Sequence, residues 1–279
     1  MSGIAELLAD PAVPDAAIAH AAATVTEGPD LELIARDEAR LLRHPAIVAA
    51  LFGNRQASMA LVSHAVAVCA RAGVRVEQIP GFDDVAAGVK AEVEAAHAPP
   101  VGSPPSAFEQ VLAETQQLAD ADAGADAGPA VSGDAAAPAL RRKGAVIDFT
   151  KLKLFEKIRL ATLGNAFCRQ TLLRDSNRLV AMAAIRSPGI TDTEVIRAAG
   201  NRAVSEDVIR YIANNKEFLK LYPVKLSLIG NPKCPLALSL RMLPHLRAED
   251  LKNLTRSKNV PSALSTAAKK LSATRGTPS

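Results

Sequence analysis

The chain has 279 residues, of which 48% are hydrophobic, and this is enough for one large domain or two smaller ones with a buried core. Only seven Phe, two Tyr and no Trp are present, so recognition of ligands or nucleic-acid bases by ring stacking has few side chains to use. The net charge of +4 hides an asymmetry, because residues 1–140 hold 7 Lys and Arg against 19 Asp and Glu whereas residues 141–279 hold 26 against 10. The sequence therefore predicts an acidic half joined to a basic half.

The first twenty residues carry three acids and no Lys or Arg, which is the wrong charge for a secretory leader. The most apolar stretch, at 60–74, is interrupted by polar residues and is too short to span a bilayer. The three cysteines, Cys69, Cys168 and Cys234, are widely spaced in apolar contexts, which is typical of small buried side chains in a reducing compartment. We expect a cytoplasmic protein.

Residues 1–97 show apolar residues at helical spacing, and the same spacing returns after residue 140. No alternating runs joined by Asn-Gly or Asp-Gly turns indicate paired strands. The sequence predicts an all-α fold with an acidic, N-terminal helical repeat region over 1–97.

One phrase occurs twice, as LLADPAVPDAAI at 7–18 and LIGNPKCPLALS at 228–239. We expect a helix to end at Asp10 or Asn231 in the left-handed conformation, and the following Pro11 or Pro232 to stop it. The second proline, Pro14 or Pro235, is expected at the first position of the next helix. The phrase thus predicts a tight corner between two short helices.

Residues 98–140 are rich in Ala, Pro, Gly and Asp, a composition that cannot bury enough apolar surface to offset the entropy of ordering. We expect a disordered linker. Within it, only residues 108–119 have helical spacing, with Phe108, Val111, Leu112 and Leu118 on one side, and there we predict a short amphipathic helix.

The basic half is predicted to form a helical region over 141–272, followed by a disordered tail at 273–279. It opens with a basic amphipathic stretch that suits an acidic protein, a nucleic acid or an anionic surface, and that equally suits an ordinary capping helix. Further cations stand near expected helix ends, where they would either line up or scatter over the surface. The candidate binding residues are Arg141, Arg142, Lys143, Lys151, Lys153, Lys157, Arg186, Arg202, Lys225, Arg256 and Lys258.

Ile158, Val180 and Val224 begin similar helix-corner phrases 22 and 44 residues apart, so a unit of about 22 residues fits. A unit that short cannot cover its own apolar face and must stack on its neighbours. The phrases LLADPAVPDAAI, AIRSPGITDTEVI and LIGNPKCPLALS resemble the bacterial leucine-rich-repeat-variant motif, a short relative of HEAT repeats, over 158–271 and more loosely over 4–75. The resemblance implies an α-solenoid of short helix pairs with a concave surface. Members of this group share no single activity, so it assigns no functional residue.

No phosphate loop, dinucleotide glycine fingerprint, Gly-x-Ser-x-Gly elbow or His-Glu-x-x-His motif is present. Asp83 and Asp84 are better explained as acids at the start of a helix than as a catalytic pair. We therefore predict a protein without enzymatic activity, metal or cofactor. An enzyme that assembles its site from distant residues is the least favoured alternative; its candidates are Asp207, Tyr211, Lys220 and Tyr222.

The function predicted from these patterns is a protein-protein interaction scaffold, with an acidic protein partner for the basic half. The alternative is sequence-nonspecific nucleic-acid binding by that half, because it carries an excess of 16 positive charges. The two halves can also pair with each other through their opposite charges, and such docking would weaken as salt rises. The oligomeric state is not predicted.

Overall fold

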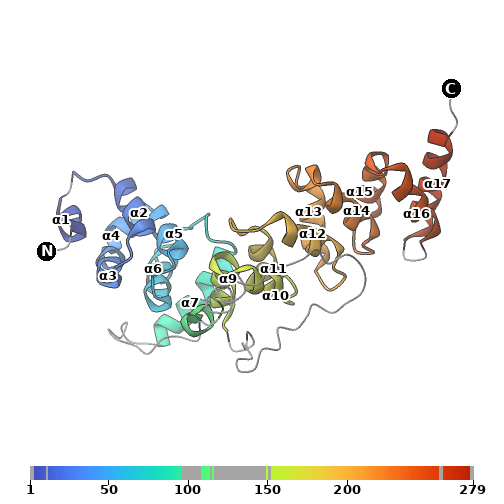
Figure 1. Ribbon diagram of the computed structural model, residues 1–279. Helices are drawn as coiled ribbons and strands as arrows, with labels where there is room; N and C mark the ends of the chain where they lie inside the picture. Colours follow the sequence, from blue (N-terminus) through green and yellow to red (C-terminus); the bar gives the residue numbers. More distant parts are fainter. Residues whose placement is uncertain are drawn as a thin grey trace. The chain divides into compact units, whose positions relative to one another are not determined.

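The computed structural model describes residues 3–10, 12–95, 108–113, 115, 149, 152–257 and 260–276. All regular structure in these residues is helical, which confirms the all-α prediction (Figure 1). The chain divides into two compact units, Met1–Asn165 and Ala166–Ser279, here called unit 1 and unit 2. The division therefore falls after residue 165 and not in the predicted linker, and the helix at 154–163 belongs to the same unit as the acidic half.

Unit 1 begins with pairs of short helices whose apolar residues point inward. Ile18 and Ala22 of one helix are fully buried, and the next layers contribute Leu51 and Val62 to the same core. The helices are α1 (Gly3–Ala9), α2 (Asp15–Thr24), α3 (Gly28–Arg36), α4 (Glu38–Arg43), α5 (Ala46–Gly53), α6 (Met59–Arg71), α7 (Phe82–Ala95) and α9 (Leu154–Leu163). Among them, α2 packs on α5, α4 on α6, and α9 on both α5 and α7.

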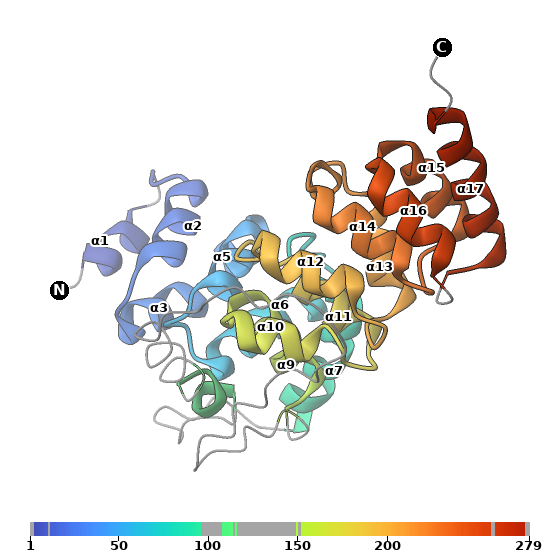
Figure 2. The ribbon, with the colours of Figure 1, turned by 45° about the vertical axis from the view of Figure 1, so that its right-hand side comes forward.

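Unit 2 is a succession of helix pairs (Figure 2). Its helices are α10 (Ala166–Leu172), α11 (Arg178–Ile185), α12 (Asp192–Gly200), α13 (Glu206–Asn214), the 3₁₀ turn η2 (Phe218–Lys220), α14 (Tyr222–Gly230), α15 (Leu236–Met242), η3 (Leu243–His245), α16 (Ala248–Arg256) and α17 (Ser262–Gly276). α10 packs on α12 and α12 on α14, while α11 packs on α13 and α15 on α17. In these four cases a helix packs on the helix two places along the chain, whereas α16 and α17 pack on each other.

The spacing of these pairs differs from the expected 22 residues. The first helices of the pairs, α10, α12, α14 and α16, start 26, 30 and 26 residues apart. Val180 lies in α11, the second helix of a pair, whereas Val224 lies in α14, a first helix. The phrases that begin at Val180 and Val224 therefore occupy different positions within a helix pair. Their spacing is not the length of a pair.

Several consecutive helices are joined by a five-residue link, here called a corner, that starts with Asp, Asn or Ser and ends with Pro, Ser or Thr. The side-chain oxygen of the first residue accepts a hydrogen bond from the main-chain nitrogen two residues on, over 2.8 Å at Asp10, Asn54 and Asn201 and 3.0 Å at Asn231. Its main-chain carbonyl accepts a second bond from the residue three places on. The described corners are DPAVP at 10–14, NRQAS at 54–58, SPGIT at 187–191, NRAVS at 201–205 and NPKCP at 231–235.

The corner differs from the expected geometry in two ways. Asn231 has φ −90° and ψ 121°, so it is extended and not left-handed, because its side chain satisfies the turn without a positive φ. Pro14 and Pro235 are N-caps with ψ of 138° and 132°, and each stands one residue before the helix, not at its first position. Pro11 lies outside the described residues.

Two other expectations have clear outcomes. Cys69, Cys168 and Cys234 are all buried free thiols, as predicted. A helix is present over the described residues 108–113, which confirms the start of the predicted amphipathic helix. Across the described ranges, no helix has the length and apolar character required to cross a membrane.

Candidate functional site

The predicted basic binding residues fall into three groups: some lie outside the described residues, and the others are divided between unit 1 and unit 2. Arg141, Arg142, Lys143, Lys151 and Lys258 lie outside the described residues. Lys153 is the N-cap of α9 and Lys157 lies one turn further along the same helix, so both belong to unit 1. Arg186, Arg202, Lys225 and Arg256 belong to unit 2.

In unit 2, one of the four predicted cations already has an aromatic partner. The guanidinium of Arg186 lies 4.9 Å from the centroid of the Tyr211 ring, within cation–π range. No carboxylate of the described chain forms an ion pair with Arg202, Lys225 or Arg256. Arg202 and Arg256 are exposed, and Lys225 is half-buried.

The structure places Arg202 and Lys225 at opposite ends of neighbouring helices. Asn231, at the C-terminal end of α14, donates from Nδ2 to the carbonyls of Ala199 and Asn201, at the C-terminal end of α12. The two helices therefore run in the same direction. Arg202 follows the C-terminal end of α12, whereas Lys225 lies in the first turn of α14, so the two do not line up along one edge.

The residues of the enzyme alternative are divided among separate local contacts. Asp207 pairs with Arg178 at 3.0 Å, and Lys220 pairs with Glu217 at 2.6 Å. Tyr222 donates its hydroxyl to Asp250 and accepts a hydrogen bond from the main-chain nitrogen of Arg247. The structure thus gives each of these side chains its own structural partner.

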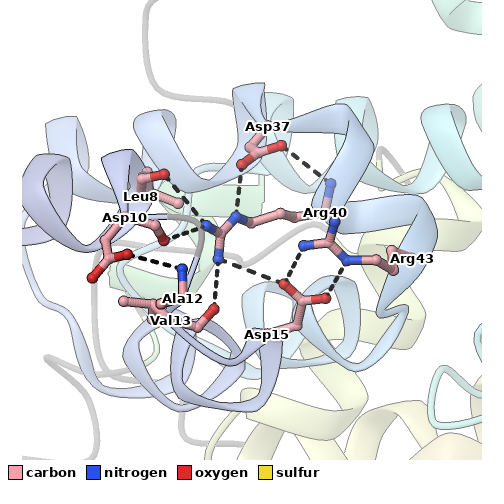
Figure 3. Close-up of polar contacts among 8 residues, drawn as sticks. All are labelled: Leu8, Asp10, Ala12, Val13, Asp15, Asp37, Arg40 and Arg43. Atoms are coloured by element: carbon pink, nitrogen blue, oxygen red, sulfur yellow. Dashed lines mark hydrogen bonds and ion pairs between the residues drawn. The ribbon is translucent and has the colours of Figure 1, made fainter.

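Residues that the sequence reasoning missed are buried arginines that bind main-chain carbonyls of the corners. Arg40, 6% exposed, donates to the carbonyls of Leu8, Asp10 and Val13 over 3.1 to 3.4 Å (Figure 3). Its charge is also matched by Asp15 at 3.5 Å and Asp37 at 3.2 Å. Arg40 therefore fixes the turn that joins α1 to α2.

Asp15 is shared between two arginines, as Figure 3 shows. Arg43 binds both of its carboxylate oxygens, at 2.5 and 2.7 Å. These hydrogen bonds, together with the positive charges of Arg43 and Arg40, hold the pKa of Asp15 below its ordinary value. The carboxylate therefore stays ionised and keeps both guanidinium groups in place.

Arg159 of α9 repeats this arrangement at the corner that follows α5. It is fully buried and donates to the carbonyls of Phe52, Asn54 and Ala57 over 2.7 to 3.2 Å. Burial lowers the pKa of Arg159 from its ordinary value to about 10, and the charge of Glu109 opposes this shift. Arg159 is therefore still a cation at neutral pH, held by neutral carbonyls.

The face of Arg159 is covered by Phe108, the first residue of the helical segment at 108–113. The guanidinium lies 4.9 Å from the centroid of the Phe108 ring, and Phe108 is only 1% exposed. Glu109 accepts a hydrogen bond from the main-chain nitrogen of Met59, the first residue of α6, over 3.1 Å. Asn165 donates from Nδ2 to the carbonyl of Thr115 over 2.5 Å. We call Arg159, the amide of Met59 and the side chain of Asn165 the Arg159 site.

In unit 2, the corner at 187–191 is held by a buried ion pair. Arg169 binds both carboxylate oxygens of Glu194, at 2.9 and 3.0 Å, and Glu194 also accepts from the hydroxyl and main-chain nitrogen of Thr191. Burial by itself raises the pKa of Glu194, but the hydrogen bonds from Arg169 and Thr191 outweigh it and the pKa lies below its ordinary value. This pair locks the start of α12.

A shallow pocket of about 290 Å³ lies where α6 ends and α7 begins. Asp83 in its wall pairs with Arg75 at 3.0 Å, at the N-terminal turn of α7, where acids complement the helix dipole. The parts of the chain that the structure describes hold no group of three or more His, Cys, Asp or Glu side chains arranged for a metal ion.

The corner phrases are the one sequence signal that could have indicated the buried arginines. At both corners three main-chain carbonyls bind the arginine: that of the first corner residue, that of the residue two places before it, and that of the residue three places after it. Buried carbonyls of this kind require a hydrogen-bond donor. Which cation reaches them depends on packing, because Arg40 lies 30 residues after Asp10 whereas Arg159 lies 105 after Asn54.

Comparison with known proteins gives no relative: no family model matches the chain, and no curated protein or solved structure matches it significantly.

Proposed function

We propose that this protein is a non-enzymatic scaffold for protein-protein interactions, built on HEAT-like helical repeats that form an α-solenoid. The observation that carries the proposal is a junction that recurs in both units. Asn54 bridges to the carbonyls of Ala22 and Val25, and Asn231 bridges to those of Ala199 and Asn201, in every case from 29 to 32 residues away. Such recurrence is typical of stacked modules, whose inner faces pack on neighbours and whose outer faces stay open to a partner.

The described surface of unit 2 supports a partner that is both acidic and apolar. The unit carries 19 Lys and Arg against eight Asp and Glu. On α15, Leu236 and Leu240 are 40% and 37% exposed, and residues four apart lie on the same side of a helix. An acidic protein with an exposed apolar residue would satisfy both features.

Affinity capture with the full-length chain tests this proposal. Wild-type protein is compared with the triple variant Arg202→Glu, Lys225→Glu, Arg256→Glu, with partners eluted by a salt gradient. The control carries the same charge change at cations that already have acidic partners: Arg178→Glu, Arg210→Glu and Lys220→Glu. We expect one defined protein to be captured stoichiometrically by the wild type and the control, and to be lost with the triple variant.

Equal loss with both variants would mean that only net charge matters, and would contradict a defined interface on these three residues. Capture of no protein by the purified wild type would contradict the scaffold function itself.

Nucleic-acid binding is the second candidate, favoured by the cationic excess of unit 2 and by Arg202, Lys225 and Arg256, for which the described residues provide no ion pair. Binding would be to duplex phosphates and indifferent to sequence. If about five phosphates are neutralised, the logarithm of the affinity falls against the logarithm of salt concentration with a slope of about −4.5. A gel-shift titration at low salt in which duplex DNA is not retarded excludes this candidate.

A further inference from the structure

A short helix from the middle of a low-complexity stretch is bound to the body of unit 1. Residues 96–107 and 116–148 on either side consist mostly of Ala, Pro, Gly, Ser and Asp. Between them, Phe108 is 1% exposed, Val111 8% and Thr115 1%, which is the burial of core residues (its trace is green in Figure 2). The composition of the surrounding sequence thus contrasts with the burial of this segment.

The Arg159 site contacts the segment at 108–115 through three of its groups: an aromatic ring, a carboxylate and a main-chain carbonyl. Arg159 recognises an aromatic ring through a cation–π contact, and the amide of Met59 recognises the acid that directly follows it. Because Met59 begins the 13-residue helix α6, a carboxylate there also gains from the helix dipole. Asn165 binds the carbonyl of Thr115 seven residues after the ring. Together these contacts specify an aromatic-acidic pair at the start of a short helix.

The binding groups of the Arg159 site are held in place by contacts that do not involve the segment. The guanidinium of Arg159 is fixed by the carbonyls of Phe52, Asn54 and Ala57, so its orientation does not depend on Phe108. The N-cap Ser58 of α6 uses its own hydroxyl for the amide of Leu61, over 3.3 Å, which leaves the amide of Met59 for an external acceptor. A rigid site of this kind costs little entropy on binding.

We propose that the Arg159 site is a recognition site for a short helix of a partner protein, in which an aromatic residue is followed directly by an acidic one and an aliphatic residue comes two places later. The chain's own segment, Phe108-Glu109-x-Val111, occupies this site as an internal ligand. It competes with the partner, so that partner binding releases the segment.

The internal ligand sets how strongly a partner must bind. Because the segment belongs to the same chain as its site, its effective local concentration is high, and an external helix of equal intrinsic affinity binds only weakly. A change that weakens the internal contact therefore strengthens the external one. This reciprocal relation separates an exchangeable ligand from a permanent part of the core.

The experiment uses a fluorescent synthetic peptide of residues 105–119 as the probe and the full-length chain as the receptor, with binding measured by fluorescence anisotropy. Three receptors are compared with the wild type: Phe108→Ser, Glu109→Gln and, as a control on the exposed side of the same segment, Ala113→Ser. We expect peptide affinity to rise at least tenfold with Phe108→Ser and to a smaller extent with Glu109→Gln. The control should bind the peptide as weakly as the wild type does.

A second set of titrations holds the Phe108→Ser receptor constant and changes the peptide. Replacing its Phe by Ser should reduce affinity at least tenfold, and replacing its Glu by Gln should reduce it less. Circular dichroism of each receptor confirms that the helical content is retained.

Two outcomes overturn the proposal. One is a folded Phe108→Ser receptor that binds the peptide no better than the wild type does. The other is a wild-type chain that light scattering finds to be a dimer and that becomes monomeric with Phe108→Ser, because the occupant would then be a second copy of the chain. The proposal deepens the scaffold function and rests on it, but its test uses purified components, so its result is independent of partner capture through unit 2.

Discussion

Arg40 and Arg159 each bind three main-chain carbonyls at equivalent positions of two corners. Each carbonyl that Arg159 binds lies 44 residues after the corresponding carbonyl that Arg40 binds. The two arginines differ in how their charge is balanced. Arg40 is paired with Asp15 and Asp37, whereas the face of Arg159 is covered by the ring of Phe108. The first site is closed by its own carboxylates, and the second is closed by a segment that arrives from elsewhere in the sequence.

Replacing Arg159 by Met is expected to destabilise unit 1 by about 3 kcal/mol or more. The substitution leaves three buried carbonyls without their donor, and each unsatisfied group costs about 1–3 kcal/mol. Urea denaturation followed by circular dichroism measures the loss. Arg36→Met is the matched control, because its pair with Glu32 is exposed and contributes less than about 0.5 kcal/mol. Equal stability of the two variants would contradict a structural role for Arg159.

The corner asparagines should differ in their contribution to the free energy of unfolding, although each makes the same type of turn hydrogen bond. Asn54→Ala and Asn231→Ala each remove two hydrogen bonds from a buried side-chain amide to an earlier helix, with an expected loss of about 2 kcal/mol. Asn201→Ala serves as the comparison. Its side-chain oxygen makes the same turn bond but it is only partly buried, so a loss of about 0.5–1 kcal/mol is expected. Thermal or urea unfolding of the three variants ranks them, and an equal effect at all three positions would show that only the turn matters.

Glu194 should make the stability of unit 2 depend on pH in acid. Its pKa is lower in the folded protein than in the unfolded chain, so the unfolded chain binds more protons as the pH falls. The stabilisation is therefore complete above about pH 5 and is lost as the pH falls through the folded pKa. We expect Glu194→Gln to cost about 3 kcal/mol at pH 7, because it removes the carboxylate that balances the charge of the buried Arg169.

The difference in unfolding free energy between wild type and Glu194→Gln should narrow as the pH is lowered from about 5 into the acid range, measured by urea unfolding at each pH. Glu206→Gln, which breaks an exposed pair with Arg210, is the control and should change stability by less than about 0.5 kcal/mol at pH 7. A difference for Glu194→Gln that stays constant over this range would contradict the assigned titration.

The thiols should be unreactive in the folded protein. Cys69, Cys168 and Cys234 are buried, and burial raises the pKa of the Cys69 and Cys234 thiols above its ordinary value. A chromogenic disulfide reagent at pH 8 is expected to modify none of them rapidly without denaturant and all three in urea. Rapid modification of one thiol under native conditions would contradict its burial.

Much of the fold can be predicted from the sequence because its signals are local. Helical spacing of apolar residues gives the all-α class, and the phrase at 228–239 gives the end of α14 and the start of α15. The helical start at Phe108 also follows from spacing alone. The left-handed geometry expected at Asn231 was wrong, because a side-chain hydrogen bond replaces the positive φ and only coordinates reveal that bond.

What only the tertiary structure decided is how distant segments meet. Composition placed residues 98–140 in a linker, yet Phe108 is buried against Arg159, because two residues 51 positions apart are brought together by packing and not by spacing. The basic residues read as one group are divided between two units, since charge along a sequence carries no information on which helix end a side chain occupies. Local chemistry determined where helices begin and end; the burial of carbonyls, and the cations that satisfy them, followed from the way those helices stack.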